Sequence, residues 1–276
     1  MDFYIKKSSG ELQRFDAGKF KRSLTRPGAD KELVEKIIHD VEKDLVNFKT
    51  TRDIYKFALS KLKYKNPPVA ARYNVKRAII EFGPSGYPFE KYVGKILEQE
   101  GYKVKVNQII RGSCIDHEVD LVVQKDSEHF MVECKFHNNQ IYKTDVQVTL
   151  YTDARFHDIK KNWKPETNQD KLHSTWVFTN TRFSSEAIKY GNCAGMLLTG
   201  WDYPKNNNLA HLIDKHGMHP ITALTSLTKK QKQYLVKHGL VLCRDADKYR
   251  ELLKNLHLSL DKIDKIVREA ELTCRI

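Results

Sequence analysis

Apolar residues along the first third of the chain recur at helical spacing, with short polar segments between them. The pattern predicts helices at about 17–25, 31–47, 51–63 and 68–82, after a small hairpin formed by FYIKK, SSG and ELQRF. Thr51 is the expected N-cap of the third helix, with Asp53 in its first turn, and Pro67 and Pro68 suit the start of the fourth. The first domain is therefore predicted to be mostly helical.

The segment GPSGYP, from Gly83 to Pro88, interrupts helix and strand alike and marks the clearest boundary. After it, PFEKYVGKILEQEGY predicts an amphipathic helix that Gly101 ends. Strands are expected near 103–110, 118–124 and 129–136, followed by a helix at about 145–157, the strand STWVFTN, the helix SSEAIKYG and the strand GMLLTGW. Strands that alternate with helices around one sheet indicate an α/β domain.

The run NNN at 206–208 is a second boundary, and short Lys-rich helices follow it. Thr228 and Gln231 form an expected capping box, and Gly239 an expected helix stop. Lys229, Lys230 and Lys232 would begin a helix able to meet phosphates. We therefore expect a multi-domain α/β protein, with domains at 1–84, 85–205 and 206–276.

The net charge of +13 favours a polyanionic partner, and its distribution is uneven. Residues 1–85 carry 19 Lys or Arg against 11 Asp or Glu, residues 86–205 carry 16 of each, and residues 206–276 carry 13 against 8. A neutral middle between basic flanks fits an acidic metal-binding centre held against a phosphate backbone by its neighbours. A basic protein without such a partner is the plainer alternative.

Compartment follows from what the sequence lacks. No apolar run approaches the ~18–20 residues that span a bilayer, so no membrane association is expected. The N-terminal MDFYIKKSSG has no apolar stretch of a signal peptide, and the five cysteines include no C-x-x-C pair. We expect a cytoplasmic protein without a zinc ribbon or a disulfide framework.

The stretch DLVVQKDSEHFMVECKF, from Asp120 to Phe136, predicts a hairpin that carries charges on apolar strands. If Gln124 pairs with His129, their numbers sum to 253, as do those of Asp120 and Glu133, whose Cβ atoms should then lie roughly 5 Å apart. Such carboxylates repel unless a divalent cation such as Mg²⁺ lies between them. Lys135 shares the face of Glu133. The alternative is a cross-strand salt bridge at a sheet edge.

The pattern Asp120…Glu133-Cys134-Lys135 resembles the PD-(D/E)xK nuclease core, particularly the Mrr-like restriction endonucleases. PFEKYVGKILEQEGYKV is similar to the first helix of that family, QVTLY to its QxxxY helix, and TNTRFSSEAIKYG to the following strand and helix, so that the resemblance covers roughly 86–205. It implies a restriction-endonuclease-like α/β/α core with a mixed sheet. Val119 stands where the family usually has Pro.

The resemblance also implies roles for individual residues. Asp120 and Glu133 would ligate Mg²⁺ or Mn²⁺, Glu90 would assist, Lys135 would activate the attacking water, and Gln147 would position the phosphate or water. Two of these residues have plainer readings: Gln147 can complete a capping box with Thr144, and Glu90 can be plain surface. Gln147, Tyr151 and Arg155 share one helix face, which faces either solvent or phosphates. His117 is a second-base candidate or a structural histidine.

Residues 3–82, with KK-SSG-ELQRFD-AGK, TRDIY and AARY, resemble the ATP-cone, a small regulatory domain that binds ATP or dATP. The resemblance implies that Lys6, Lys7 and Lys19 contact phosphates and that Thr51 and Tyr55 lie by the ribose and base. Tyr55 stands where the family often has His, and Gln13 where it often has an acid. The alternative is a basic helical DNA-binding domain without a pocket.

The combined interpretation is a Mg²⁺-dependent DNA endonuclease, regulated by ATP or dATP and serving in genome defence by analogy. Its partners would be DNA, an adenine nucleotide and further copies of itself. There are two alternatives. One is a nucleotide-responsive DNA-binding regulator whose nuclease fold is inactive, and the other is a junction-resolving nuclease.

Overall fold

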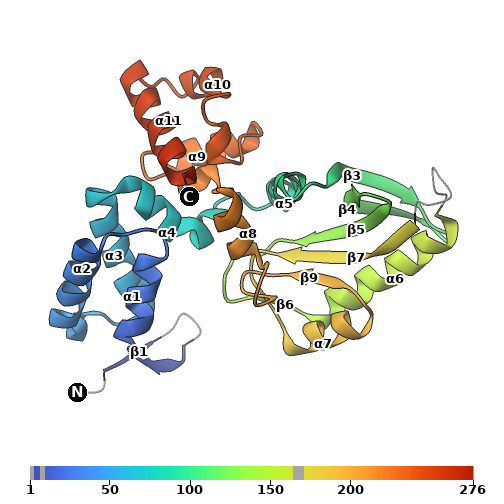
Figure 1. Cartoon of the computed structure of the whole chain (residues 1–276), viewed down its shortest axis with the longest axis horizontal. Coiled ribbons are helices and arrows are strands. Elements are labelled where there is room, and N and C mark those ends of the chain that lie inside the picture. The colour runs from blue at the N-terminus through green and yellow to red at the C-terminus, as the bar shows by residue number, and fades with distance from the viewer. Residues whose placement is uncertain (1–2, 7–9, 164–170, 276) are drawn as a thin grey trace.

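The computed structural model describes residues 3–6, 10–163 and 171–275. Its first part is a short antiparallel hairpin followed by four helices (Figure 1). The elements are β1 (Tyr4–Lys6), β2 (Leu12–Arg14), α1 (Ala17–Thr25), α2 (Lys31–Lys43), the 3₁₀ turn η1 (Leu45–Asn47), α3 (Thr51–Lys65) and α4 (Pro67–Ile80). The expected mostly helical composition of this part and its small hairpin are confirmed, and the first helix has the predicted ends.

The start of α3 differs from the sequence prediction by one residue. Thr50, not Thr51, is the N-cap: its hydroxyl accepts from the Asp53 backbone N–H, and the Asp53 carboxylate accepts from the Thr50 backbone N–H. This reciprocal pair is a capping box, which satisfies two donors that the helix leaves open. Thr51 is therefore the first helical residue, and its predicted capping role is wrong.

The central part is one five-stranded mixed sheet with the order β3-β4-β5-β7-β9 (Figure 1). Its strands are β3 (Lys103–Arg111), β4 (Asp116–Lys125), β5 (Glu128–Lys135), β7 (Lys171–Thr179) and β9 (Leu197–Thr199). β3, β4 and β5 pair antiparallel, whereas β5, β7 and β9 pair parallel. A small parallel pair, β6 (Lys143–Thr144) with β8 (Arg182–Phe183), lies beside it. The expected α/β class and mixed sheet are confirmed.

Helices cover both faces of this sheet. α5 (Tyr87–Gln99) packs on β3 and β4, while α6 (Val146–Asn162) and α7 (Ser185–Cys193) cover the other face (Figure 1). The apolar stripe of α5 is fully buried against Leu121 and Val132, and Phe156 of α6 packs against Met131. Burial on both sides explains why the inner strands are nearly continuous apolar runs.

The last part consists of short helices whose core is continuous with that of the sheet domain. It contains α8 (Leu209–His216), η2 (Ile221–Ala223), α9 (Lys229–Lys237), η3 (Cys243–Asp245), α10 (Arg250–Lys254) and α11 (Leu260–Cys274). The predicted Thr228–Gln231 capping box and the stop at Gly239, with φ of 89°, are confirmed. Residues of α5 and of α11 belong to the same hydrophobic cluster.

Helix α4 joins the first part to the rest. Val69 and Ala70 at its start belong to the core of the helical first part, while Val75 and Ile79 at its end belong to the core shared by the sheet domain and the last helices. Buried hydrogen bonds add to this contact, because the Thr222 hydroxyl donates to the Ala78 carbonyl at 2.6 Å. α4 therefore fixes how the three parts meet.

Candidate active site

The β4–β5 hairpin has the register that the sequence predicts. Gln124 pairs with His129 and Leu121 with Val132, so the next opposed residues are Asp120 and Glu133. The regular pairing stops at Leu121, and the Asp120 carboxylate instead accepts the Cys134 backbone N–H at 2.7 Å. The two acidic side chains are thereby brought together at the end of the hairpin.

A buried arginine from α6 is the direct partner of Glu133. The Arg155 guanidinium donates to the Glu133 carboxylate at 2.7 Å, and the two side chains are only 10% and 20% exposed. The pair is absent from the sequence prediction, which placed Arg155 on a shared face of the helix without a partner. The sequence did indicate that Arg155 and Tyr151 lie on one helix face, because they are four residues apart. In the structure the Arg155 guanidinium lies 5.3 Å from the centroid of the Tyr151 ring.

Burial and mutual repulsion perturb the carboxyl groups of the site. Burial, followed by the charge of Asp120, raises the pKa of Glu133. Burial also raises the pKa of Asp120, against the lowering effect of the Cys134 N–H bond. The pKa of Glu90 on α5 is raised to about 7, first by burial and then by the nearby Asp120. Burial therefore disfavours the charged form of all three carboxyl groups, and perturbed pKa values of this kind are typical of functional carboxylates.

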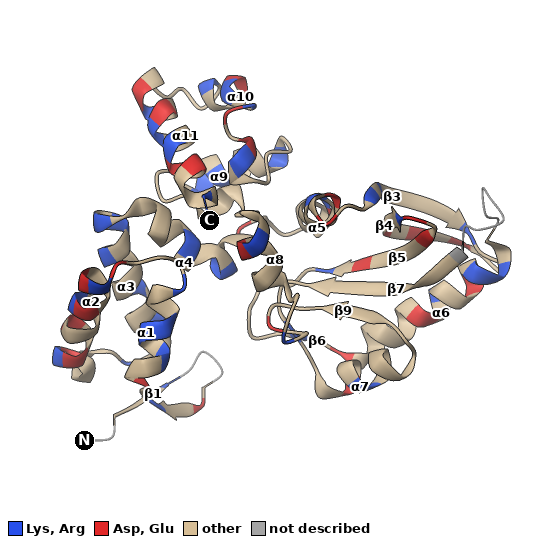
Figure 2. Cartoon of the chain, in the orientation of Figure 1, with Lys and Arg blue, Asp and Glu red and all other residues tan. Residues whose placement is uncertain are grey.

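Figure 2 shows acidic positions on both β4 and β5. Lys135 and Glu118 are the further charged groups that act on this site. Lys135 is exposed at the last position of β5, and its positive charge lowers the pKa of both Asp120 and Glu133. Glu118 is exposed on β4 and its charge raises the pKa of Glu90 and Asp120. Sequence reasoning missed Glu118, although its spacing of two from Asp120 placed it on the same strand face.

Gln147 and Tyr151 lie at exposed positions on α6, on the same side as Arg155. The cap of this helix is Asp145, whose carboxylate accepts from the Gln147 and Val148 backbone N–H groups. Thr144 instead donates its hydroxyl to Thr179, so the alternative of a Thr144–Gln147 capping box is wrong. His117 bonds to Asp158 at 2.8 Å and is 8% exposed, as expected for a structural histidine.

The donor set of the hairpin end suits a hard cation. Among the described residues, no group of three or more His, Cys, Asp or Glu side chains is arranged to hold a metal ion. Asp120 and Glu133 nevertheless offer carboxylate oxygens that repel each other, and Mg²⁺ is commonly held by one or two carboxylates with waters and substrate phosphate as its other ligands. A divalent cation bound between the two carboxylates would stabilise their charged forms and so lower their raised pKa values.

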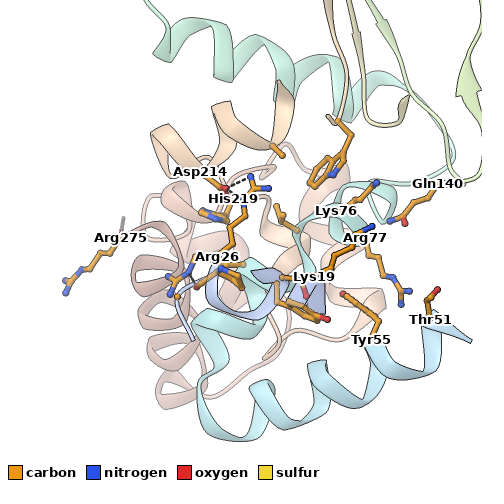
Figure 3. A pocket seen from close by; sticks show the side chains of 18 residues that line it. Lys19, Arg26, Thr51, Tyr55, Lys76, Arg77, Gln140, Asp214, His219 and Arg275 are labelled. Atoms are coloured by element: carbon orange, nitrogen blue, oxygen red, sulfur yellow. Dashed lines mark hydrogen bonds and ion pairs between the residues drawn. The ribbon is translucent and has the colours of Figure 1, made fainter. Parts of the chain in front are cut away.

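The residues expected to bind a nucleotide divide into two groups. Lys19, Thr51 and Tyr55 line one cavity together (Figure 3). Lys6 does not line it: its backbone bridges to Thr50, and its side chain is exposed at the end of β1. Lys7 lies outside the described residues. The sequence therefore identified cavity-lining residues of the first part only, and none from the sheet domain or the last part.

The lysines at the start of α9 do not form a single phosphate-binding row. Lys229 and Lys230 are exposed, but Lys232 is only 8% exposed and pairs with Glu81 at 3.3 Å. Because its charge is used at the contact between α9 and the end of α4, Lys232 is a structural residue, and its predicted contact with phosphates is wrong.

Comparison with known proteins gives matches for two of the three parts. Residues 84–200 match the family model described as Restriction endonuclease, and residues 219–274 match the one described as AF1548-like, C-terminal. An uncharacterized protein of Archaeoglobus fulgidus is 39% identical over 180 residues, which are 65% of this chain and 98% of that protein.

A solved structure gives the same result in three dimensions. The structure titled "Crystal Structure of Protein of Unknown Function AF1548" has 37% sequence identity and a TM-score of 0.57, and the match covers 69% of this chain and 98% of that one. Among the described residues, no helix is both long and apolar enough to cross a membrane.

Proposed function

The chain belongs to the family of the Archaeoglobus fulgidus protein, and from that premise we propose that it is a metal-dependent endonuclease that hydrolyses DNA. One observation carries the proposal. In a domain that matches the restriction endonuclease model, Asp120 and Glu133 meet at the end of a hairpin, with Lys135 beside them. Two mostly buried carboxyl groups with raised pKa values beside a lysine suit phosphodiester hydrolysis.

The roles follow from the positions of the side chains. Asp120 and Glu133 would hold Mg²⁺ or Mn²⁺, which when bound would stabilise negative charge on the phosphate and lower the pKa of the attacking water. Lys135, at the exposed end of β5, would orient that water or receive its proton. Glu90, with a pKa of about 7, can carry a proton near neutral pH, and Gln147 would contact the phosphate from α6.

Arg155 sets a condition on this site. Its guanidinium holds one oxygen of Glu133, so that in the structure the carboxylate already has a cationic partner. Ligation of a metal by Glu133 would use the other oxygen or displace Arg155. With the other oxygen as the metal ligand, Arg155 would keep the carboxylate oriented, and we assign it as a positioning residue.

We also propose that an adenine nucleotide, ATP or dATP, regulates the enzyme through the N-terminal helical part. The resemblance of residues 3–82 to the ATP-cone supports this proposal, as does the cavity that Lys19, Thr51 and Tyr55 share. The same proposal includes a nucleotide-dependent change of homo-oligomeric assembly. It also includes a cytoplasmic location and a role in genome defence. Lys6 would contact the phosphates only if the hairpin approached the cavity, and a contact of Lys7 with the phosphates belongs to the same proposal.

The test is cleavage of supercoiled plasmid by the full chain with and without Mg²⁺ or Mn²⁺. We expect metal-dependent nicking that Glu133→Gln or Lys135→Ala abolishes while DNA binding is retained. Lys105→Ala, at an exposed position on β3 outside the site, is the matched control and should cut normally. Full activity of Lys135→Ala would refute its assigned role. DNA binding by the wild type without cleavage would favour a DNA-binding regulator instead, and a strong preference for branched DNA a junction-resolving nuclease.

A further inference from the structure

The cavity that contains Lys19 lies where all three parts of the chain meet. Its volume is about 800 Å³, within the range typical of small-molecule sites. The helical first part contributes residues of α1, α3 and α4, the sheet domain contributes Gln140 and Trp201, and the last part contributes Asp214, His219 and Arg275 (Figure 3). No one part of the chain forms this site alone.

The lining carries a large excess of positive charge. Six basic residues and one acidic residue line the cavity: Lys19, Arg26, Arg72, Lys76, Arg77 and Arg275, with Asp214. The side chain of Arg275 is exposed and points away from the cavity (Figure 3), so the other five supply its positive charge. Among the described residues, only Arg26 of these six has an acidic partner, Asp214 at 2.6 Å. Arg72 is held rigidly, because its guanidinium donates to the carbonyls of Pro27 at 2.6 Å and Leu272 at 2.9 Å. Such a lining favours a compact polyanion.

Buried polar atoms without well-formed hydrogen bonds line the same cavity. The side-chain amide nitrogen of Gln140 is buried and has no hydrogen-bond partner among the described residues. Both ring nitrogens of His219, which is only 2% exposed, lack a well-formed hydrogen bond in the part of the chain that the structure describes, with the Cys274 thiol as a neighbour. Buried polar groups are normally hydrogen-bonded, because leaving one unpaired costs about 1–3 kcal/mol. A ligand with several acceptor atoms would satisfy these groups, which come from the sheet domain and the last part.

Aromatic rings form flat walls between the basic groups. Tyr73 stacks on Tyr55 with ring centroids 5.0 Å apart, and the Arg77 guanidinium lies 3.6 Å from the Tyr55 centroid. The Tyr55 faces are thus occupied by protein groups. Trp201 is half-buried and has the Lys76 ammonium 5.2 Å from its ring, so it is the ring on which a planar ligand group can pack.

We propose that this composite cavity binds a nucleoside triphosphate, with its phosphates among the arginines and His219 and its base against Trp201 and Gln140. The proposal deepens the nucleotide regulation proposed above and rests on it. It differs in assigning the ligand to residues of all three parts. Binding would therefore favour one arrangement of those parts, because a ligand shifts an equilibrium only toward the state that it binds better.

The route to the nuclease site is short along the chain. Gln140 follows Lys135 by five residues, in the loop between β5 and β6. That loop is fixed in between, where the His137 backbone N–H donates to the Asn180 side chain at 2.8 Å and the Asn180 amide donates to the His137 carbonyl at 2.7 Å. A ligand that engages Gln140 would therefore act on a segment that ends at Lys135.

Calorimetry with the full chain tests the composite site directly, using ATP, inorganic triphosphate and a short DNA duplex as separate probes. We expect ATP to bind, inorganic triphosphate to bind more weakly, and the duplex not to compete. Gln140→Leu and His219→Phe should each weaken ATP binding about 10-fold, as loss of one hydrogen bond to a charged ligand implies. The matched controls are Asn138→Leu in the same loop as Gln140 and His211→Phe on α8, both exposed and outside the lining, and both should bind normally.

Several outcomes would overturn the inference. If Gln140→Leu and His219→Phe bind ATP like the wild type while Lys19→Ala does not, the site belongs to the helical first part alone. Equal affinity for inorganic triphosphate and ATP would show that the base makes no contact. Competition by the duplex would show that the cavity binds DNA instead. Absence of ATP binding would refute the site. Plasmid cleavage by the same preparations separates the two proposals, because ATP binding without cleavage refutes the nuclease and cleavage without ATP binding refutes the cavity.

Discussion

Replacing Arg155 with Met should destabilise the protein strongly, because the change leaves Glu133 as a buried charge without a partner. Both side chains are less than a quarter exposed and 2.7 Å apart, so solvent screens the pair little. Breaking a buried pair typically costs about 3–5 kcal/mol. The cost has a ceiling, because Glu133 can take up a proton instead. From its ordinary pKa of 4.5, protonation at pH 7.5 costs about 4 kcal/mol, so we expect a loss of about 3–4 kcal/mol.

The assay is thermal and urea unfolding of the wild type and Arg155→Met between pH 5 and pH 7.5. At pH 7.5 the loss corresponds to a decrease in Tm of roughly 6–15 °C for a protein of this size. The difference should shrink by about 1.4 kcal/mol for each pH unit below 7.5, since protonation of Glu133 becomes cheaper as pH falls. Mg²⁺ should restore part of the stability, because a bound cation replaces the lost partner.

Arg182→Met is the matched control. Arg182 also pairs with a carboxylate at 2.7 Å, that of Asp202, but its side chain is 62% exposed. A surface pair of this kind is worth about 0–1 kcal/mol, so the control should lose little stability at any pH. The reasoning would be refuted if Arg155→Met unfolded within 1 kcal/mol of the wild type at pH 7.5, or if the difference did not change with pH.

Three further changes test other contacts. Burial lowers the pKa of Lys76 to about 8; because only its charged form attracts an anion, ATP affinity measured by calorimetry should fall as pH rises through 8, and Lys76→Met should lose most of that dependence. Tyr92→Phe should cost about 1–3 kcal/mol in urea unfolding, because it leaves the Met218 carbonyl, 2.7 Å from the Tyr92 hydroxyl, without its donor; an unchanged midpoint would contradict this. Thr50→Ala should cost about 1 kcal/mol and Thr51→Ala clearly less, and the reverse order would show that the cap assignment is wrong.

The hairpin shows how much of the candidate site the sequence could supply. Its register depends on a tight turn at Asp126 and Ser127 and on apolar residues two apart, all within one short segment, and this was enough to oppose Asp120 and Glu133. The capping box at Thr228 was also predictable, because its partner Gln231 lies three residues away. Even at this short range, the prediction chose Thr51 as the cap of α3 where the structure has its neighbour Thr50.

Contacts between distant segments were beyond the sequence for a physical reason. Arg155 reaches Glu133 only because α6 packs on the sheet at one rotation and height, which the burial of Phe156 and Ile159 decides. The separation of the last part from the sheet domain at 206 was read from NNN, yet both share one hydrophobic core. Periodicity indicates that a helix has an apolar face, and it does not indicate which partner covers that face.

The helices, the register of the hairpin and the acidic pair with its lysine followed from the sequence alone, since each depends on residues close together along the chain. Only the tertiary structure decided which cation holds Glu133 and that segments from Lys19 to Arg275 enclose one cavity. Gln140 and His219 line that cavity because packing around α4 brings the three parts together, and no local pattern specifies such an approach.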